Sequence, residues 1–88
     1  MSEESLIEYP CEFPIKIMGK SEVFRFAQSV LEVVLRHAPD FDASSMEMRA
    51  SREGKYISLT CTVTATSRTQ LDALYVELCD HPDVVMVL

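Results

Sequence analysis

The stretch Tyr56–Ala65, with the sequence YISLTCTVTA, decides the fold of this chain. Apolar residues alternate with tyrosine and hydroxyl residues through the whole stretch; one side holds Ile57, Leu59, Cys61, Val63 and Ala65, and the other holds Tyr56, Ser58, Thr60, Thr62 and Thr64. A period of two residues is typical of a β-strand with one buried face. Because the second face is rich in hydroxyls, the strand fits an antiparallel sheet that is covered on one side only. We therefore expect an open-faced domain of two layers.

The residues before this strand predict a strand, a helix and a second strand. Residues 13–18 (FPIKIM) alternate as a short strand, and Gly19 and Lys20 are expected to form the turn that follows. Ser21 is the predicted N-cap of a helix that ends near His37, because Pro39 cannot continue it. Residues 45–51 alternate again, with Met46, Met48 and Ala50 on the apolar side. A hairpin turn at residues 52–55 then needs Gly54 for its positive φ.

The residues after the long strand predict a second helix and a last strand. Ser67 and Gln70 have the spacing of a capping box, so the helix begins near Ser67. An apolar stripe at helical spacing follows, made of Leu71, Leu74, Tyr75 and Leu78. Pro82 ends this helix, and residues 84–88 (VVMVL) form a fully apolar strand.

These elements follow one another in the order β-α-β-β-α-β, which is the ferredoxin-like arrangement. The expected fold class is α+β, a two-layer sandwich whose antiparallel sheet has the strand order 4-1-3-2. Right-handed crossovers place both helices on one face of that sheet. The other face is expected to collect Lys16, Glu47, Arg49, Tyr56, Ser58, Thr60, Thr62 and Thr64.

Length and charge indicate one domain with an acidic tail. The chain has 88 residues and a net charge of −6, and a chain of this length forms a single domain. Four acids and no base stand in residues 1–12, so the other residues carry ten of the fourteen acids against all eight bases. We expect residues 1–12 to be a flexible acidic tail and residues 13–88 to be the folded domain.

The cysteines and the hydropathy pattern indicate a cytoplasmic protein. Cys11, Cys61 and Cys79 are odd in number and widely spaced, which predicts free thiols in a reducing compartment. The acidic start does not resemble a signal peptide, and no apolar run has the length of a membrane span. We expect a cytoplasmic location and no contact with a membrane.

Familiar activities of this fold need residues that this sequence lacks. RNA-recognition domains stack bases on aromatic residues of the central strands, but the strand at residues 56–65 shows threonines and has Tyr56 as its only aromatic residue. A metal carrier would need two cysteines in the first turn, and an acylphosphatase would need an asparagine; this sequence has Gly19-Lys20-Ser21 in that turn and no asparagine. His37 and His81 fall at helix ends, where capping explains them. We therefore expect neither nucleic acid binding nor enzymatic activity, and no metal or cofactor.

Five short motifs together resemble the YbeD-like family of small uncharacterised bacterial proteins. They are Phe13-Pro14 leading to Lys16-Ile17-Met18-Gly19, Glu32-Val33-Val34 leading to Arg36-His37-Ala38-Pro39, Ser51-Arg52-Glu53-Gly54-Lys55-Tyr56 leading to Ser58, Leu74-Tyr75-Val76-Glu77-Leu78, and Val84-Val85-Met86-Val87-Leu88. The match covers residues 11–88. The resemblance implies a fold similar to the ACT domain, which senses small molecules in amino-acid metabolism.

The resemblance also suggests a candidate ligand site. ACT domains bind effectors near the turn after the first strand, and the matching residues here are Gly19, Lys20 and Ser21. Gly19 would admit a ligand close to the backbone, and Ser21 with the first helical amides would hold a carboxylate. The alternative is a plain tight turn followed by an N-cap.

The last strand provides a candidate interaction edge. In the order 4-1-3-2, residues 84–88 lie at an edge and carry neither charge nor proline to block pairing. Val84, Met86 and Leu88 are expected to face the core, which leaves Val85 and Val87 on the open face. We expect a protein partner, or a second copy, at this edge or on the open face. The predicted function is a non-catalytic regulatory or protein-interaction domain, and the alternative is a small-molecule sensor for an amino acid or a carboxylate.

Overall fold

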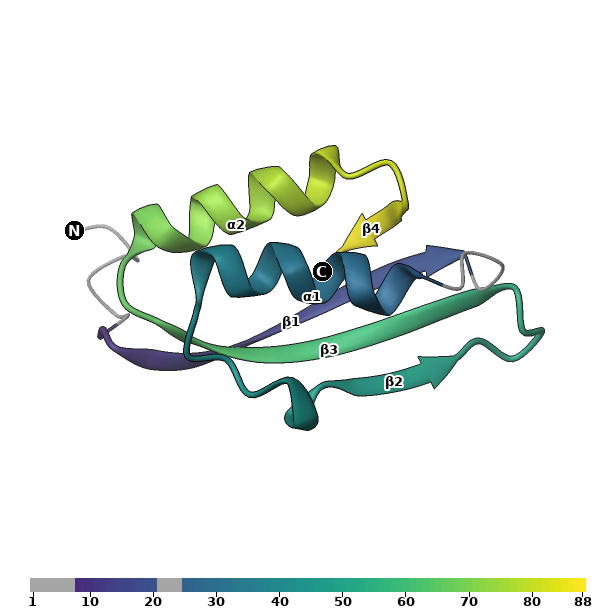
Figure 1. The fold of residues 1–88 in the computed structure, drawn as a ribbon, viewed down its shortest axis with the longest axis horizontal. Helices are drawn as coiled ribbons and strands as arrows, with labels where there is room; N and C mark the ends of the chain where they lie inside the picture. Colours follow the sequence, from purple (N-terminus) through teal and green to yellow (C-terminus); the bar gives the residue numbers. More distant parts are fainter. Residues whose placement is uncertain (1–7, 21–24) are drawn as a thin grey trace.

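The computed structural model of the chain describes residues 8–20 and 25–88 (Figure 1). The elements in chain order are β1 (Cys11–Lys20), α1 (Phe26–His37), a short 3₁₀ turn (Ala43–Ser45), β2 (Glu47–Ala50), β3 (Tyr56–Ala65), α2 (Arg68–Asp80) and β4 (Val84–Val87). The β-α-β-β-α-β order is confirmed, and β3 has the predicted bounds.

The four described strands form one antiparallel sheet in the order β2-β3-β1-β4. This is the predicted order 4-1-3-2 read from the opposite edge. The two central strands pair along their full length, from Cys11 opposite Ala65 to Lys20 opposite Tyr56. The fold is therefore α+β and consistent with a ferredoxin-like arrangement.

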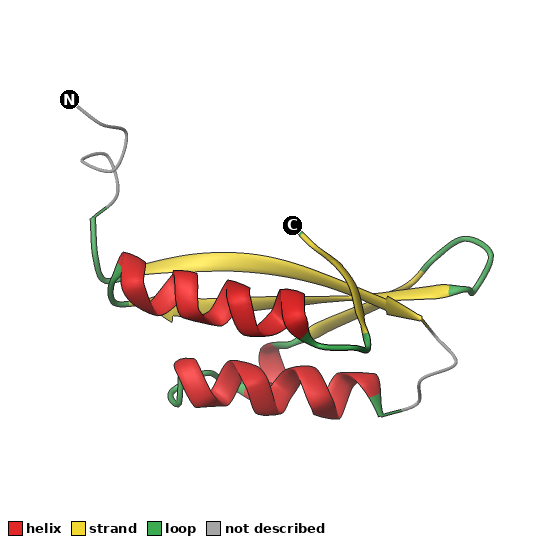
Figure 2. Cartoon of the chain, turned by 90° about the horizontal axis from the view of Figure 1, so that it is seen from above, coloured by secondary structure: helices red, strands yellow, loops and turns green. Residues whose placement is uncertain are grey.

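One hydrophobic core lies between the sheet and the two helices, which run side by side (Figure 2). The alternation in β3 is confirmed, because Leu59 is fully buried whereas Thr60 is half-buried and Thr62 is exposed. The buried apolar side chains of the sheet and helices are Ile15, Ile17, Phe26, Val30, Val33, Val34, Leu59, Cys61, Val63, Ala65, Leu71, Leu74 and Leu78. The helices thus cover one face of the sheet and leave the other open.

The first strand is longer than the sequence predicts. Cys11 and Glu12, which the charge pattern assigns to the tail, belong to β1, and Tyr9 packs against the core just before it. At the other end, Gly19 and Lys20 lie in β1 and not in a turn. The reason is the pairing with β3, because an alternating partner of ten residues supports a strand of the same length.

Helix α1 has the predicted end and one buried face. Phe26, Val30, Val33 and Val34 are buried, and the helix ends at His37 ahead of Pro39. Its N-cap position is held by Arg25, without a capping bond from that side chain. The N-cap predicted at Ser21 lies outside the described residues.

Strand β2 is an exposed edge strand. It spans four residues, and all four are exposed; Met48, predicted to face the core, keeps 59% of its surface in solvent. Met48 does lie opposite the buried Leu59, so its side is predicted correctly, but the core does not extend over this edge. The hairpin turn that follows is confirmed, because Gly54 has a φ of 76°.

The predicted cap of α2 is present. The Ser67 side chain accepts a hydrogen bond of 3.0 Å from the Gln70 backbone N–H. In return, the Gln70 side-chain oxygen accepts a bond of 2.6 Å from the backbone N–H of Thr66, one residue before the N-cap. These two bonds fix the start of the helix, as in a capping box.

Candidate functional site

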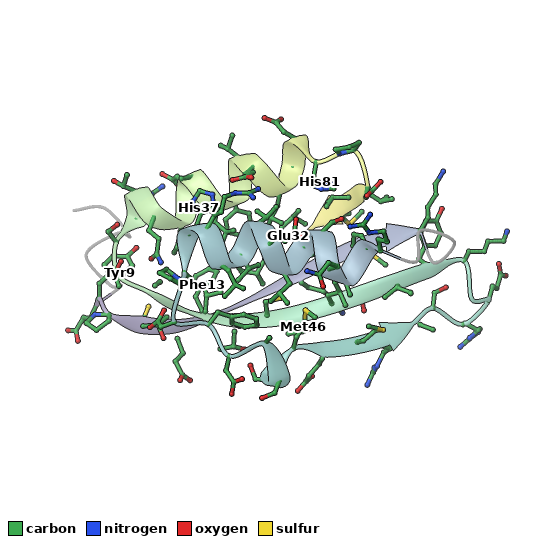
Figure 3. The ribbon with its side chains drawn as sticks, in the orientation of Figure 1. Tyr9, Phe13, Glu32, His37, Met46 and His81 are labelled. Carbon is green, nitrogen blue, oxygen red and sulfur yellow. The ribbon has the colours of Figure 1, made fainter. Side chains whose placement is uncertain are left out.

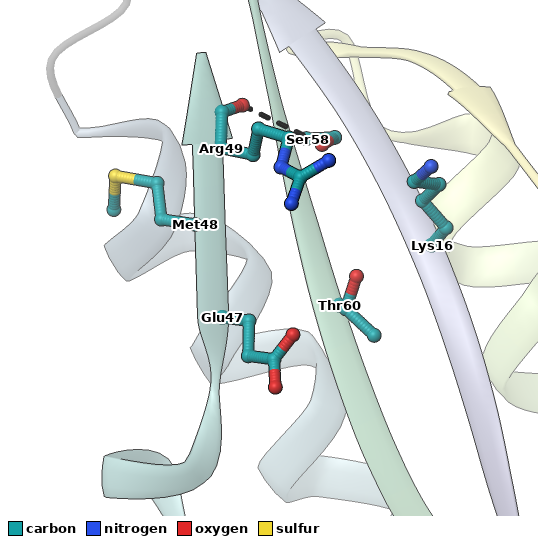
Figure 4. A pocket seen from close by; sticks show the side chains of 6 residues that line it. All are labelled: Lys16, Glu47, Met48, Arg49, Ser58 and Thr60. Atoms are coloured by element: carbon teal, nitrogen blue, oxygen red, sulfur yellow. Dashed lines mark hydrogen bonds between the residues drawn. The ribbon is translucent and has the colours of Figure 1, made fainter.

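The uncovered side of the sheet, here called the open face, is polar near its centre. Register places Thr60 between Glu47 on β2 and Lys16 on β1, and it places Ser58 between Arg49 and Met18. Figure 4 shows these polar side chains standing on one side of the sheet, with both helices behind it. The predicted composition of the open face is therefore confirmed at these positions.

A shallow hollow of about 310 Å³ lies on this face (Figure 4). It is lined by Lys16, Glu47, Met48, Arg49, Ser58 and Thr60. The Ser58 hydroxyl donates to the backbone oxygen of Arg49 at 3.5 Å. Charges of both signs and two hydroxyls can form hydrogen bonds with a polar surface. In the described part of the chain, however, the hollow holds no nucleophile hydrogen-bonded to a base.

A second hollow, of about 460 Å³, lies near the start of β1 and is acidic. Its lining residues are Glu12, Asp40, Phe41, Asp42, Ser45, Glu47, Thr62 and Thr64. Asp42 has a structural role there, because its carboxylate accepts bonds from the backbone N–H and the hydroxyl of Ser44, at 3.0 and 2.7 Å. Those bonds hold the pKa of Asp42 below its ordinary value.

The β4 edge contains an irregularity that the sequence does not reveal. Val87 lies opposite Ile17 and Met86 opposite Met18, but Val84 lies opposite Gly19, so the register shifts between the last two pairs. Val85 is therefore the extra residue of a β-bulge. Beyond β4, Leu88 exchanges two backbone hydrogen bonds with Lys16, of 2.8 and 3.2 Å.

The bulge leaves Val84 facing the core as predicted, and it reverses the predicted facing of residues 86–88. Val84 and Val87 pack against the core, so the prediction that Val87 lies on the open face is wrong. Met86 and Leu88 lie opposite the open-face residues Met18 and Lys16, so the prediction that they face inward is also wrong. The physical reason is the extra residue, which shifts the two-residue alternation by one position.

Three apolar side chains consequently stand in solvent at one edge of the sheet. Val85 is 51% exposed, Met86 48% and Leu88 63%. We call Val85, Met86 and Leu88 the edge patch. The half-buried Met18 adjoins the patch, because it pairs with Met86. Val85, one of the two residues predicted for an interaction edge, is part of it.

The predicted ligand turn has a different environment. A Cβ atom on Gly19 would lie 2.4 Å from the Phe26 ring, so packing against Phe26 explains the glycine. Lys20 is exposed at the end of β1, opposite Tyr56. Ser21 lies outside the described residues. The structure thus places Gly19 in the sheet under a core aromatic ring, and not in an open turn.

A charged cluster joins the two helices and was not predicted from the sequence. The Glu77 carboxylate accepts a hydrogen bond from Arg36, and its other oxygen lies 2.7 Å from Nε2 of His37, which is labelled in Figure 3. The bond from Arg36, and then the one from His37, hold the pKa of Glu77 below its ordinary value. The Gln70 side-chain amide also donates to the backbone oxygen of His37 at 2.8 Å.

The two histidines therefore have structural partners. His37 contacts Glu77 of α2, which goes beyond the capping role that the sequence suggests. His81 accepts a hydrogen bond of 3.1 Å at Nδ1 from the backbone N–H of Asp83, which shapes the turn before β4. The only available signal for the His37 cluster was that Arg36, His37 and Glu77 all fall within the family motifs.

The cysteines are all free. Cys61 is fully buried on the inner face of β3, and this burial raises the pKa of its thiol to about 11. Cys11 is half-buried and Cys79 is exposed. Across residues 8–20 and 25–88, no group of three acidic, histidine or cysteine side chains is placed to hold a metal ion. Neither helix within these ranges has the length and apolar character needed to cross a membrane.

Comparison with known proteins identifies the family. Residues 4–88 match the model of a protein family of unknown function, DUF493. The chain is 66% identical to the UPF0250 protein NE1487 of Nitrosomonas europaea over 88 residues, which is the full length of both. It is 59% identical to a UPF0250 protein of Bordetella pertussis, over 98% of this chain and 93% of that protein. The chain therefore belongs to the DUF493 (UPF0250) family. The YbeD-like family that the motifs resemble is this same family, so the resemblance is confirmed.

Two solved structures share the fold. The solution structure of protein HP0495 from H. pylori matches with a TM-score of 0.69 at 17% identity, over 100% of this chain and 94% of that one. The C-terminal domain of the MgtC protein from Mycobacterium tuberculosis matches with a TM-score of 0.63 at 13% identity, over 93% and 88%. At such low identity, these likenesses concern the fold alone.

Proposed function

We propose that this chain is a non-catalytic interaction domain that binds a partner protein through the β4 edge. The observation that carries the proposal is the edge patch, in which Val85, Met86 and Leu88 are each about half exposed or more. Burying apolar surface is the main driving force of protein association. The patch lies at a sheet edge and has Met18 beside it, so a partner would gain apolar contacts on the open face.

The edge lacks the usual protection against pairing. Natural edge strands carry lysine, proline or inward-pointing charges, and residues 84–88 have none of these. Strand β4 is protected by its length of four residues and by the bulge at Val85, and the bulge also turns Met86 and Leu88 outward. We infer that the edge is kept apolar for binding and that the bulge directs how it binds.

A regulatory role in the cytoplasm is part of this proposal. The two-layer arrangement resembles the ACT domain, whose functions are regulatory, and this likeness supports regulation by analogy of fold. The three free thiols support a reducing compartment. A stand-alone sensor that uses Gly19 and Lys20 has less support, because Phe26 fills the space next to Gly19.

Affinity capture with matched variants tests the proposal. The tagged full chain is used to capture proteins from a lysate of its source organism, and the captured partner is purified for titration calorimetry. Val85→Lys is expected to weaken this complex by at least about tenfold, which corresponds to roughly 1.4 kcal/mol. Val76→Lys is the matched control, because Val76 is 61% exposed and lies on the side of α2 away from the buried Leu74 and Leu78. Equal affinities for the two variants would contradict binding at β4.

A further inference from the structure

The opposite edge of the sheet, at β2, has the pattern of a surface that pairs with itself. Strand β2 forms the outer strand next to β3, and all four of its residues are exposed. Its centre reads Glu47-Met48-Arg49, so an acid and a base flank an apolar residue. Nothing in the proposed role of β4 uses this edge.

The outward backbone groups of β2 come from the apolar positions. The Ser51 N–H donates to the Tyr56 oxygen at 2.8 Å, and in an antiparallel pair such bonds recur at every second residue. The peptide groups of Arg49 and Glu47 therefore point toward β3. Those of Met48 and Ala50 point away from it, toward the side on which the sheet has no further strand.

The side chains of β2 fall into two sets. Glu47 and Arg49 lie opposite Thr60 and Ser58 on the open face. In the described ranges of the chain, neither the Glu47 carboxylate nor the Arg49 guanidinium forms an ion pair. Met48 faces the helix side and remains 59% exposed there. The edge thus offers two unpaired charges of opposite sign on one face and an uncovered methionine on the other.

We propose that two copies of this chain associate through β2, antiparallel, with Met48 of one copy opposite Met48 of the other. This register places Glu47 of each copy opposite Arg49 of its partner, and opposite charges at directly opposed positions stabilise a strand pair. It also pairs the outward peptide groups of the two Met48 residues and brings together two methionines that are exposed in the single chain. A register with residue 47 opposite residue 47 would pair two glutamates, and one with residue 49 opposite residue 49 would pair two arginines. Like charges at directly opposed positions disfavour both registers.

The contact is short, so we expect a weak and salt-sensitive dimer. A strip of four residues on each copy buries less than the roughly 1,200 Å² at which standard interfaces begin. Exposed ion pairs are screened at an ionic strength of about 1 M, where the Debye length is roughly 3 Å. The proposal is independent of the β4 proposal, because β2 and β4 are the two opposite edges of the sheet.

A charge-swap series tests the dimer. Sedimentation equilibrium of the full chain is measured from about 10 μM to about 1 mM, a range that covers weak association. Glu47→Arg and Arg49→Glu are each expected to raise the dimer dissociation constant at least about tenfold, and the double variant to restore it to within about threefold of wild type. Glu8→Arg, the same charge change at an exposed position before β1, is expected to leave the dimer unchanged.

Crosslinking tests the register separately. In a Cys11→Ser/Cys79→Ser background, Met48→Cys is expected to form a disulfide dimer under mild oxidation, because directly opposed Cα atoms lie about 5.5 Å apart. Arg49→Cys is expected to form far less, since residue 49 faces residue 47 of the partner. A wild-type monomer throughout the concentration range, or a double variant no tighter than the single ones, would overturn the proposal. Val85→Lys should leave the β2 dimer intact. The outcome of the dimer test is therefore independent of whether a partner protein binds at β4.

Discussion

Replacing Gly19 by alanine tests whether this residue is a glycine because Phe26 packs against it or because a ligand binds there. The added Cβ would lie 2.4, 2.5 and 2.7 Å from Cε1, Cζ and Cδ1 of Phe26. Carbon atoms in contact prefer separations of about 3.5–4.0 Å, so the ring would have to move by roughly 1 Å. Phe26 is only 1% exposed and is surrounded by the core, so it has little room to move.

The expected cost follows from two opposing effects. Overpacking a core costs about 1–3 kcal/mol, whereas replacing glycine by alanine stabilises by roughly 0.4–1 kcal/mol through the unfolded chain. We therefore expect Gly19→Ala to lower the free energy of unfolding by about 1–2 kcal/mol. With a slope near 1 kcal/mol per molar urea, the unfolding midpoint should fall by about 1–2 M.

A double-mutant cycle with Phe26→Leu identifies the cause. The smaller side chain should accommodate the new methyl group, so the double variant should be more stable than the sum of single effects predicts, by about 1 kcal/mol. Gly54→Ala is the matched control. Gly54 has a φ of 76° and open space around its Cβ position, so its substitution should be costly without coupling to Phe26. A Gly19→Ala variant within about 0.5 kcal/mol of wild type, or equal coupling at both glycines, would refute the packing argument.

Two further predictions concern the sheet and the helix cluster. Leu59→Ala should lower the free energy of unfolding by about 2–5 kcal/mol because it opens a core cavity. Thr60→Ala, on the open face, should lower it by less than about 1 kcal/mol. Equal losses for the two variants in urea unfolding would show that the open face is covered. Because its folded pKa is depressed, Glu77 stabilises the fold above its unfolded pKa, and this contribution is lost as the pH falls through the folded pKa. The melting temperature of wild type should therefore exceed that of Glu77→Gln at neutral pH, and the two melting temperatures should converge in acid. Asp72→Asn, an exposed control on α2, should have the melting temperature of wild type at each pH. A constant difference between wild type and Glu77→Gln at all pH values would exclude this role for Glu77.

The parts of the fold that the sequence predicts are those set by local patterns. The alternation in Tyr56–Ala65, the Ser67 cap and the apolar stripe of α2 each depend on residues near one another in the chain. These patterns predict the long strand and the second helix, and the preference for right-handed crossovers then predicts the order of the strands in the sheet.

The parts that the sequence does not predict depend on tertiary contacts. The bulge at Val85 appears only when β4 pairs with β1, so the facing of Met86 and Val87 cannot be read from an all-apolar strand. Likewise, the role of Gly19 is set by Phe26, and the His37–Glu77 contact joins residues 40 positions apart. The exposed Met48 follows from where the core ends, which the alternation of β2 does not encode.

Mapping the partner's footprint by NMR tests the central claim most directly. Backbone amide shifts of the 88-residue chain are followed while the captured partner is added. Binding through β4 predicts that the largest shifts cluster at Met18 and at the edge patch of Val85, Met86 and Leu88, with Val76 on α2 unaffected. Shifts centred on the outer face of α2, with the edge patch unchanged, would contradict the proposed function.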